Sequence, residues 1–156
     1  MNKVAIAFLT KDRIELSKRT VEPLLQSDKF DLFWYDGSIT DEGRNLVTSL
    51  IPTRVGGKVS FTHVRGGPDA AVACALTWML SDWSDGKGNT HRYDFVGLVE
   101  NDVLLDPSWF ERTMALFEHG KADGLEVGAV SARAYEDRIL CQRNGYALVH
   151  NIGWGQ

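Results

Sequence analysis

Hydrophobic and polar residues alternate in blocks along this chain, and the blocks predict strands and helices in turn. Short apolar runs at 4–9, 30–35, 59–64 and 95–99 have the length and composition of strands. The first run is apolar at every position, as expected of a strand that is covered on both faces. Between the runs, apolar residues recur at helical spacing. This alternation predicts an α/β fold with a mostly parallel central sheet.

The second half of the chain continues the pattern. Asp106 and Pro107 predict a helix start, because proline in the first turn loses no hydrogen bond and a preceding Asp can cap free N–H groups. That helix is expected over 107–119, followed by strands at 126–134 and 145–150. The late strands predict a mixed edge toward the C-terminus. The expected architecture is a Rossmann-like three-layer α/β/α sandwich.

Individual residues in the helical segments carry further expectations. Pro23 lies inside the first helix, where it would kink or end it. Ser38 and Asp41 fit a capping box that opens a helix over 41–50. Cys74 lies in the apolar pattern of the third helix, which indicates a small buried thiol.

Residues with chemical potential gather where predicted strands end. The strand at 95–99 stops at Glu100, Asn101 and Asp102. In open α/β sheets, ligands bind outside the carboxyl ends of the strands. Glu100 and Asp102 can share one hard cation, because Mg²⁺ or Mn²⁺ bridged to substrate phosphates needs only one or two carboxylates. The alternative is that they are ordinary polar residues where a strand reaches the surface.

Three other polar residues have two interpretations each. Asp36, after the second strand, is either a ligand contact or a turn residue. Arg65, in the glycine-containing junction before the third helix, either holds a phosphate or is a solvated charge. His150, near the last predicted strand, is either a metal or phosphate ligand or a structural residue.

Composition narrows the class of protein. A chain of 156 residues with 44% hydrophobic content predicts one globular domain over 1–156. Its net charge of −4 and the lack of a Lys/Arg cluster argue against nucleic-acid binding. No segment has the length of a membrane span, and the two cysteines suggest no disulfide framework. We therefore expect a cytoplasmic protein.

The ordered motifs resemble those of family 2 GT-A nucleotide-sugar glycosyltransferases. The first strand leads into Thr10-Lys11-Asp12-Arg13, which is similar to the family's Thr-x-x-Arg turn. Residues 36–41 resemble its Asp-x-Ser-x-Asp segment, and residues 65–71 resemble its glycine-bearing entry to a long helix. Glu100-Asn101-Asp102 stands where the family has its Asp-x-Asp metal motif. The resemblance covers residues 3 to about 135.

This resemblance implies metal-dependent transfer of a sugar from a UDP- or GDP-sugar to an acceptor that the sequence does not specify. Asp102 would bind the Mn²⁺ or Mg²⁺ that bridges the diphosphate, with Glu100 in place of the family's first Asp. The ion would stabilise charge developing on the leaving nucleoside diphosphate. Asp36 would contact the nucleotide base, with Thr10 close by. The candidate contacts to the nucleotide sugar are Thr10, Arg13, Asp36, Ser38, Arg65, Asp69, Glu100 and Asn101.

The general base of inverting family members comes from a segment beyond the metal motif. In this chain that region offers Glu136 and Asp137 in a predicted turn, and Asp137 is the candidate base. The aromatic and Arg context that the family has after such a pair is absent. We therefore expect a nucleotide-binding half whose acceptor region is missing or lies on another polypeptide, with nucleotide-sugar binding and little transfer.

Two other functions fit the same fold class. A nucleotidyltransferase usually carries a glycine-rich loop with Arg and Lys after its first strand, and residues 10–13 contain no glycine. A non-catalytic α/β binding module would use some of the five tryptophans at a protein or saccharide interface. The alternative is that they pack the core, and Trp83 fits the apolar stripe of the third helix. No GxSxG, P-loop or HExxH motif is present.

Overall fold

A computed structural model describes residues 3–55, 58–81, 83–84, 90–127, 130, 139–143 and 146–149. The chain forms two compact units, Met1–Leu105 and Asp106–Gln156. The first unit holds the main sheet, whose strands are β1 (Val4–Thr10), β2 (Asp31–Asp36), β3 (Val59–His63) and β6 (Phe95–Glu100). All neighbouring pairs are parallel, in the order β3-β2-β1-β6. The α/β class and the parallel sheet are confirmed.

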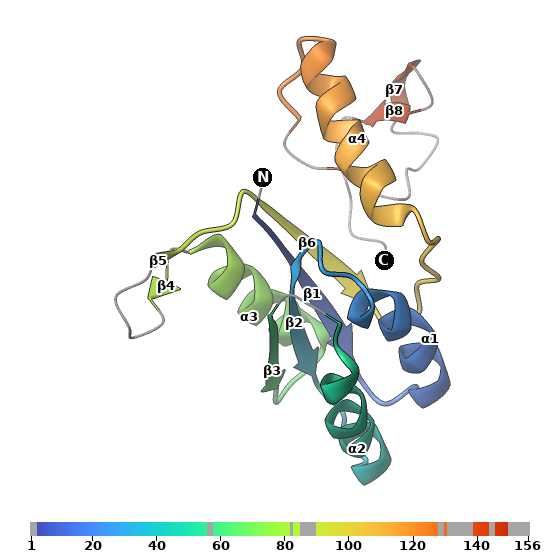
Figure 1. Cartoon of the computed structure of the whole chain (residues 1–156), viewed down its shortest axis with the longest axis vertical. Helices are drawn as coiled ribbons and strands as arrows, with labels where there is room; N and C mark the ends of the chain where they lie inside the picture. The colour runs from blue at the N-terminus through green and yellow to red at the C-terminus, as the bar shows by residue number, and fades with distance from the viewer. Residues whose placement is uncertain are drawn as a thin grey trace. The chain divides into compact units, whose positions relative to one another are not determined.

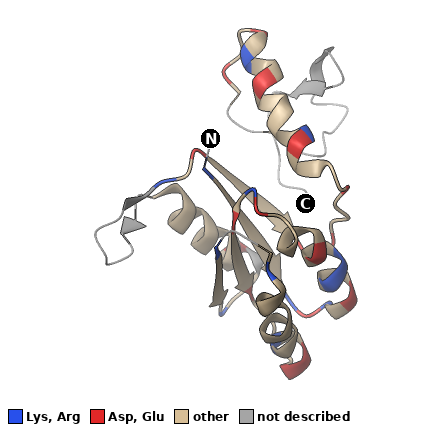
Figure 2. Ribbon diagram, viewed as in Figure 1, with Lys and Arg blue, Asp and Glu red and all other residues tan. Residues whose placement is uncertain are grey.

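Helices cover both faces of this sheet. They are α1 (Ile14–Leu25), α2 (Asp41–Leu50) and α3 (Pro68–Leu80), with a short 3₁₀ turn, η1 (Ile51–Thr53), after α2. Figure 1 shows α1 and α2 on one face and α3 on the other. Asp41 and Glu42 occupy the first turn of α2, coloured red in Figure 2, where carboxylates complement the positive end of the helix dipole.

The side chains of β1 alternate between two buried layers. Ala5 and Ala7 belong to a core cluster with Ala75 and Met79 of α3. On the opposite face Phe8 packs edge-to-face on Trp34, with ring centroids 5.2 Å apart, and both side chains are fully buried. Burial on both faces explains why β1 is apolar at every position.

The order of the strands places a switch point beside β1. The connections through α1 and α2 add β2 and then β3 on one side of β1. The connection through α3 then returns to the other side, where β6 pairs with β1. Successive strands therefore leave β1 in opposite directions, and the carboxyl ends of β1 and β6 frame the crevice where such sheets bind ligands.

Several local expectations need correction. Trp83 does not lie on α3, because the helix ends at Leu80 and Trp83 starts the two-residue strand β4 (Trp83–Ser84), which pairs antiparallel with β5 (Thr90–His91). Cys74 is exposed, not buried. Pro23 lies within α1, which continues past it to Leu25. The apolar composition of α3 on all sides explains the error at Cys74, since it marks no single buried face.

The second unit contains α4 (Trp109–Ala122), β7 (Ile139–Arg143) and β8 (Tyr146–Val149). The helix starts at Trp109, two residues later than expected, with Ser108 as its N-cap. Asp106 Oδ1 accepts a hydrogen bond from the Ser108 N–H at 2.9 Å, in the turn before the helix. Among the described strands, β7 and β8 pair with each other in a separate antiparallel sheet. The described part of the expected strand at 126–134 is irregular.

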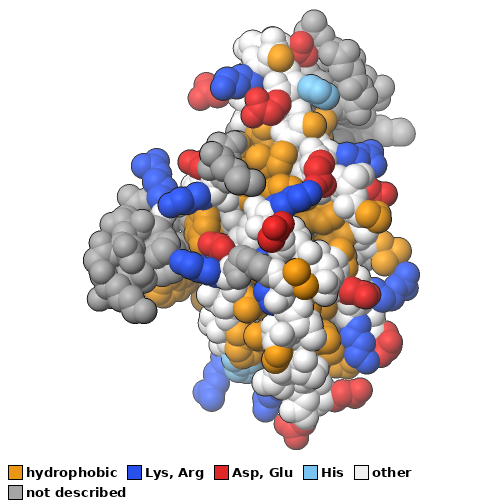
Figure 3. Space-filling view, viewed as in Figure 1, with side chains coloured by type: hydrophobic (Ala, Val, Ile, Leu, Met, Phe, Trp, Pro, Cys, Tyr) orange, Lys and Arg blue, Asp and Glu red, His pale blue; other side chains and the backbone are white. Residues whose placement is uncertain are grey.

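Among the described residues, no helix has both the length and the apolar composition that crossing a bilayer requires. On the face drawn in Figure 3, coloured acidic and basic side chains are interspersed.

Core packing by α1 can be tested with two leucines of that helix. Leu24 is fully buried, whereas 39% of Leu16 is exposed. We expect Leu24→Ala to lower the free energy of unfolding by about 2–5 kcal/mol, because it removes apolar contacts and leaves a cavity. Leu16→Ala is the matched control, with an expected change of about 0.5 kcal/mol or less. Urea unfolding followed by tryptophan fluorescence measures both, and equal losses would contradict the assigned face.

Candidate functional site

A cavity of about 390 Å³ lies at the carboxyl edge of the main sheet. Its walls come from the ends of β1 and β6 and from the turn that enters α3. This is the switch point of the sheet, where ligands are expected. The lining residues are Leu9, Thr10, Lys11, Arg13, Gly37, Val64, Gly66, Gly67, Ala71, Glu100, Asn101 and Asp102.

The cavity brings together only part of the site expected from the sequence. Five expected residues line it, namely Thr10, Arg13, Glu100, Asn101 and Asp102. Four others do not line it, although glycines of the same two segments, Gly37, Gly66 and Gly67, do: Asp36, Ser38, Arg65 and Asp69. Asp137 and His150 lie outside the described residues. Lys11 also lines the cavity, although the sequence patterns did not indicate it as a candidate site residue. Its place inside the Thr-x-x-Arg turn was the sequence signal that could have identified it.

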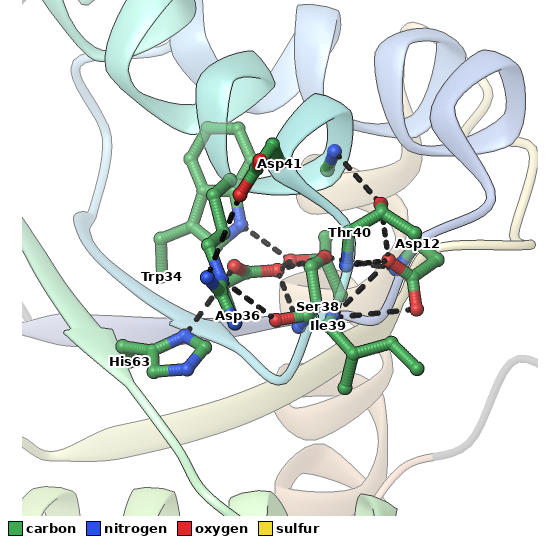
Figure 4. Close-up of polar contacts among 11 residues, drawn as sticks. Asp12, Trp34, Asp36, Ser38, Ile39, Thr40, Asp41 and His63 are labelled. Atoms are coloured by element: carbon green, nitrogen blue, oxygen red, sulfur yellow. Dashed lines mark hydrogen bonds and ion pairs between the residues drawn. The ribbon is translucent and has the colours of Figure 1, made fainter.

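Asp36 anchors the ends of two strands behind the cavity (Figure 4). Its carboxylate is fully buried, and Oδ1 accepts hydrogen bonds from Thr10 Oγ1 at 2.8 Å, Ser38 Oγ at 2.6 Å and the Ser38 N–H at 3.3 Å. Thr10 Oγ1 in turn accepts a bond from Trp34 Nε1 at 2.8 Å. The network therefore locks the register in which Thr10 pairs with Asp36.

The second oxygen of Asp36 has a different environment. Oδ2 is buried without a hydrogen-bond partner among the described residues, and His63 Nδ1 lies 3.7 Å from it. His63 is the register partner of Asp36 on β3. The expected contact between Asp36 and a nucleotide base stays a prediction, and Oδ2 is the oxygen with capacity for it.

Asp12 ties the β1–α1 loop to the β2–α2 loop. Its Oδ1 accepts hydrogen bonds from the Ile39 N–H at 3.2 Å, the Thr40 N–H at 3.1 Å and Thr40 Oγ1 at 2.7 Å. Its own N–H donates to Ser38 Oγ at 2.9 Å. These bonds are visible around Asp12 in Figure 4. Together they hold the two loops that flank the carboxyl ends of β1 and β2.

The cap of α2 also differs from the expectation. Thr40, not Ser38, is the N-cap, and its Oγ1 accepts a hydrogen bond from the Gly43 N–H at 3.1 Å. Ser38 is unavailable because it bonds Asp36 and Asp12. A side chain at Gly43 would meet Ser38 Oγ at 2.6 Å, so glycine there permits the close approach.

The turn after β1 is strained. Asp12 and Arg13 both have positive φ values, 51° and 34°, although neither is glycine. Such residues cost about 1–3 kcal/mol each and persist where surrounding contacts fix them, often at functional sites. The hydrogen bonds of Asp12 supply that fixation. The result is that Arg13 lines the cavity, where its Nη1 lies 2.8 Å from Asp102 Oδ2.

The segment after β6 is held from the other side by α1. Asn101 is nearly buried, and its Nδ2 donates a hydrogen bond to Ser17 Oγ at 3.0 Å. Thr20 Oγ1 contacts the carbonyl oxygens of Asn101 and Val103 at 3.2 and 2.8 Å. Asn101 therefore positions Glu100 and Asp102, and its expected contact with a ligand stays a prediction.

The carboxylates of the cavity could hold a metal ion only if a bound ligand supplied further donor atoms. Across the described ranges, no three or more His, Cys, Asp or Glu side chains form a group that could hold an ion. Glu100 and Asp102, the two carboxylates on the cavity wall, are a partial donor set of hard oxygen ligands. Mg²⁺ and Mn²⁺ are commonly bound in this way, with phosphate oxygens and waters completing the shell.

The same cavity also offers partners for an anion. Lys11 and Arg13 line it, and the entry to α3 adds Gly66 and Gly67. Gly66 has φ 137°, which favours glycine, and Gly67 immediately precedes the first residue of α3. The N-terminus of a helix carries a partial positive charge that favours phosphate groups. The cavity thus combines partners for a phosphate with partners for a divalent cation.

No family model and no curated protein matches the chain.

The Asp36 network can be tested at Thr10. We expect Thr10→Val to destabilise the protein by about 1–3 kcal/mol for each buried polar group left unsatisfied, namely the Trp34 indole N–H and one site on Asp36. Thr10→Ser keeps the hydroxyl and is the matched control. Urea unfolding provides the free energies, and a neutral Thr10→Val would show that the network contributes little.

The loop contact of Asp12 predicts a pH dependence. The hydrogen bond from the Thr40 side chain holds the pKa of Asp12 below its ordinary value of 3.8. The ionised form therefore stabilises the fold above pH 3.8, and this contribution is lost as the pH falls through the lowered pKa. Asparagine tolerates the left-handed backbone at this position, so Asp12→Asn removes the charge without adding strain. We expect this variant to be less stable than the natural protein at neutral pH.

Acid should narrow that difference in stability. Urea unfolding of both proteins at about pH 6 and about pH 3 tests this, because the proton linkage acts only on the carboxylate. A difference that stays constant between the two pH values would contradict the assigned role of the Asp12 charge.

Proposed function

We propose that this chain is the donor-binding domain of a metal-dependent glycosyltransferase. It binds a UDP- or GDP-sugar at the carboxyl edge of the main sheet, with Mn²⁺ or Mg²⁺ between the diphosphate and the carboxylates of Glu100 and Asp102. The supporting observation is the cavity at the β1–β6 switch point, whose lining includes two carboxylates, Glu100 and Asp102, and two cationic side chains, Lys11 and Arg13.

The size and charge of the cavity support a nucleotide ligand. Its volume of about 390 Å³ falls within the range of sites for small organic molecules. A nucleoside diphosphate carries its negative charge at one end, and that charge needs cations that a protein of net charge −4 does not supply in excess. A bound divalent ion, Lys11, Arg13 and the N-terminus of α3 would provide them together.

Convergence of distant motifs is the second line of support. Arg13 and Asp102 belong to segments 89 positions apart, the Thr-x-x-Arg turn and the Glu-x-Asp motif, yet their side chains touch. The glycines at the entry to α3 line the same cavity. Three motifs that are short and unspecific in the sequence thus contribute residues to one ligand-sized space, and this supports the resemblance to GT-A enzymes.

The proposed chemistry assigns one role to the carboxylates of the cavity and another to its cationic side chains. The ion held by Asp102 and Glu100 would stabilise the charge that develops on the leaving nucleoside diphosphate. Lys11 and Arg13 would orient the phosphates. Sugar transfer further requires a base and an acceptor site, and Asp137, the candidate base, lies outside the described residues.

Calorimetric titration of UDP and of GDP, each with and without Mn²⁺, tests this proposal. We expect one of them to bind only when Mn²⁺ is present. Asp102→Asn should weaken that binding at least about tenfold, because even outer-shell partners of a metal contribute this much. Asp41→Asn is the control, because it removes the same charge from a carboxylate on α2 that is 94% exposed.

Two outcomes would contradict the proposal. Nucleotide binding that does not depend on Mn²⁺ would contradict the proposed metal site. Equal losses of binding in Asp102→Asn and Asp41→Asn would contradict it as well. Tight binding of a saccharide or protein without nucleotide would instead favour a non-catalytic binding module.

A further inference from the structure

The carboxylate proposed to bind the metal already has a cationic partner in this structure. Arg13 Nη1 lies 2.8 Å from Asp102 Oδ2, and both side chains remain well exposed, at 59% and 43%. Both residues line the cavity. The guanidinium is therefore already a counter-ion of the carboxylate that would hold a metal ion.

A divalent ion and the guanidinium compete for this carboxylate. The ion has twice the charge, and it approaches a carboxylate oxygen to about 2.1 Å. An exposed ion pair is weak because solvent and salt screen it. The two cations also repel each other when they share one carboxylate. Arrival of the metal thus favours release of Arg13 from Asp102.

Release leaves Arg13 beside the ligand that comes with the metal. Its backbone is fixed by the Asp12 contacts, so only its side chain needs to move. The planar guanidinium presents paired N–H groups that match phosphate oxygens. A diphosphate that bridges to an ion on Asp102 would lie within reach of those groups, because Arg13 and Asp102 are already in contact.

We propose that Arg13 is an exchangeable counter-ion of the cavity. It pairs with Asp102 when the cavity holds no metal, yields Asp102 to the ion when the metal–nucleotide complex binds, and then pairs with the diphosphate. This inference rests on the proposed donor site and adds to it a positioning residue with two alternating partners.

Exchange predicts effects of opposite sign on two ligands. Without the guanidinium, Mn²⁺ alone no longer has to displace a partner from Asp102 and should bind more tightly. The same loss deprives the bound diphosphate of a contact, so nucleotide binding at saturating Mn²⁺ should weaken. A purely structural role for Arg13 would weaken both.

The test uses Arg13→Asn in the full chain. Asparagine tolerates the left-handed backbone at this position, so the substitution removes the guanidinium without adding strain. We expect the Kd of Mn²⁺ alone, measured by electron paramagnetic resonance of free Mn²⁺, to fall about two- to fivefold. The Kd of UDP or GDP at saturating Mn²⁺, measured by calorimetry, should rise about tenfold or more.

Two further variants separate pairing from net charge. Lys18→Gln removes a positive charge from the outer surface of α1, where Lys18 pairs with Glu15, and should change neither Kd. Lys11→Gln removes a cavity charge that is not paired with Asp102. It should weaken nucleotide binding, while its effect on Mn²⁺ alone should be smaller than that of Arg13→Asn.

The failure of the exchange is distinguishable from the failure of the proposed function. If the natural protein binds nucleotide with Mn²⁺, but Arg13→Asn weakens or leaves unchanged the binding of Mn²⁺ alone, the exchange is overturned and the donor site stands. If the natural protein binds neither Mn²⁺ nor nucleotide, both are overturned. Comparable thermal unfolding of the variants confirms that binding reports on the cavity.

Discussion

A buried carboxylate sets the geometry of the carboxyl edge of the sheet. A charged group without water is costly unless it is hydrogen-bonded, and Asp36 is fully buried. Its Oδ1 meets this requirement with donors from Thr10 at the end of β1 and from Ser38 in the next turn. Slipping β1 against β2 would leave these groups unpaired, so the network favours a single register. The floor of the cavity follows from that register.

The constraint extends from Asp36 to the charges of the cavity through a continuous series of contacts. Ser38 bonds both Asp36 and the backbone of Asp12, and Asp12 bonds the loop before α2. These bonds stabilise two consecutive left-handed residues, a conformation that the isolated loop would leave. Arg13 is the second of the two. The position of Arg13 at the cavity thus depends on the Asp12 carboxylate, which does not itself line the cavity. Functional side chains are held precisely when such supporting contacts are rigid.

How far the sequence predicts this arrangement depends on the range of the interactions involved. The strands were predictable because burial on both faces demands apolar runs such as 4–9, and the position of Glu100 and Asp102 followed from the end of such a run. The role of Asp12 was not predictable from the sequence, because its hydrogen-bond partners lie 27 and 28 positions away. Ser38 and Thr40 were both suitable caps for α2, and only the competing bonds of Ser38 decide between them. The exposed Cys74 was missed because α3 is apolar all round.

The charge balance of the cavity bears on how its two ligands would bind. Lys11 and Arg13 line the cavity together with Glu100 and Asp102, so the charged lining is neutral as a whole. A metal alone must separate Asp102 from Arg13, and a diphosphate alone meets two carboxylates. If both bound, the ion would satisfy the carboxylates and the released guanidinium of Arg13 would satisfy the phosphate. Each ligand therefore removes the electrostatic cost of the other, and this coupling must be reciprocal. If the proposed site is right, a neutral cavity of this kind would select the metal–nucleotide complex over either component, which a cavity of one sign would not do.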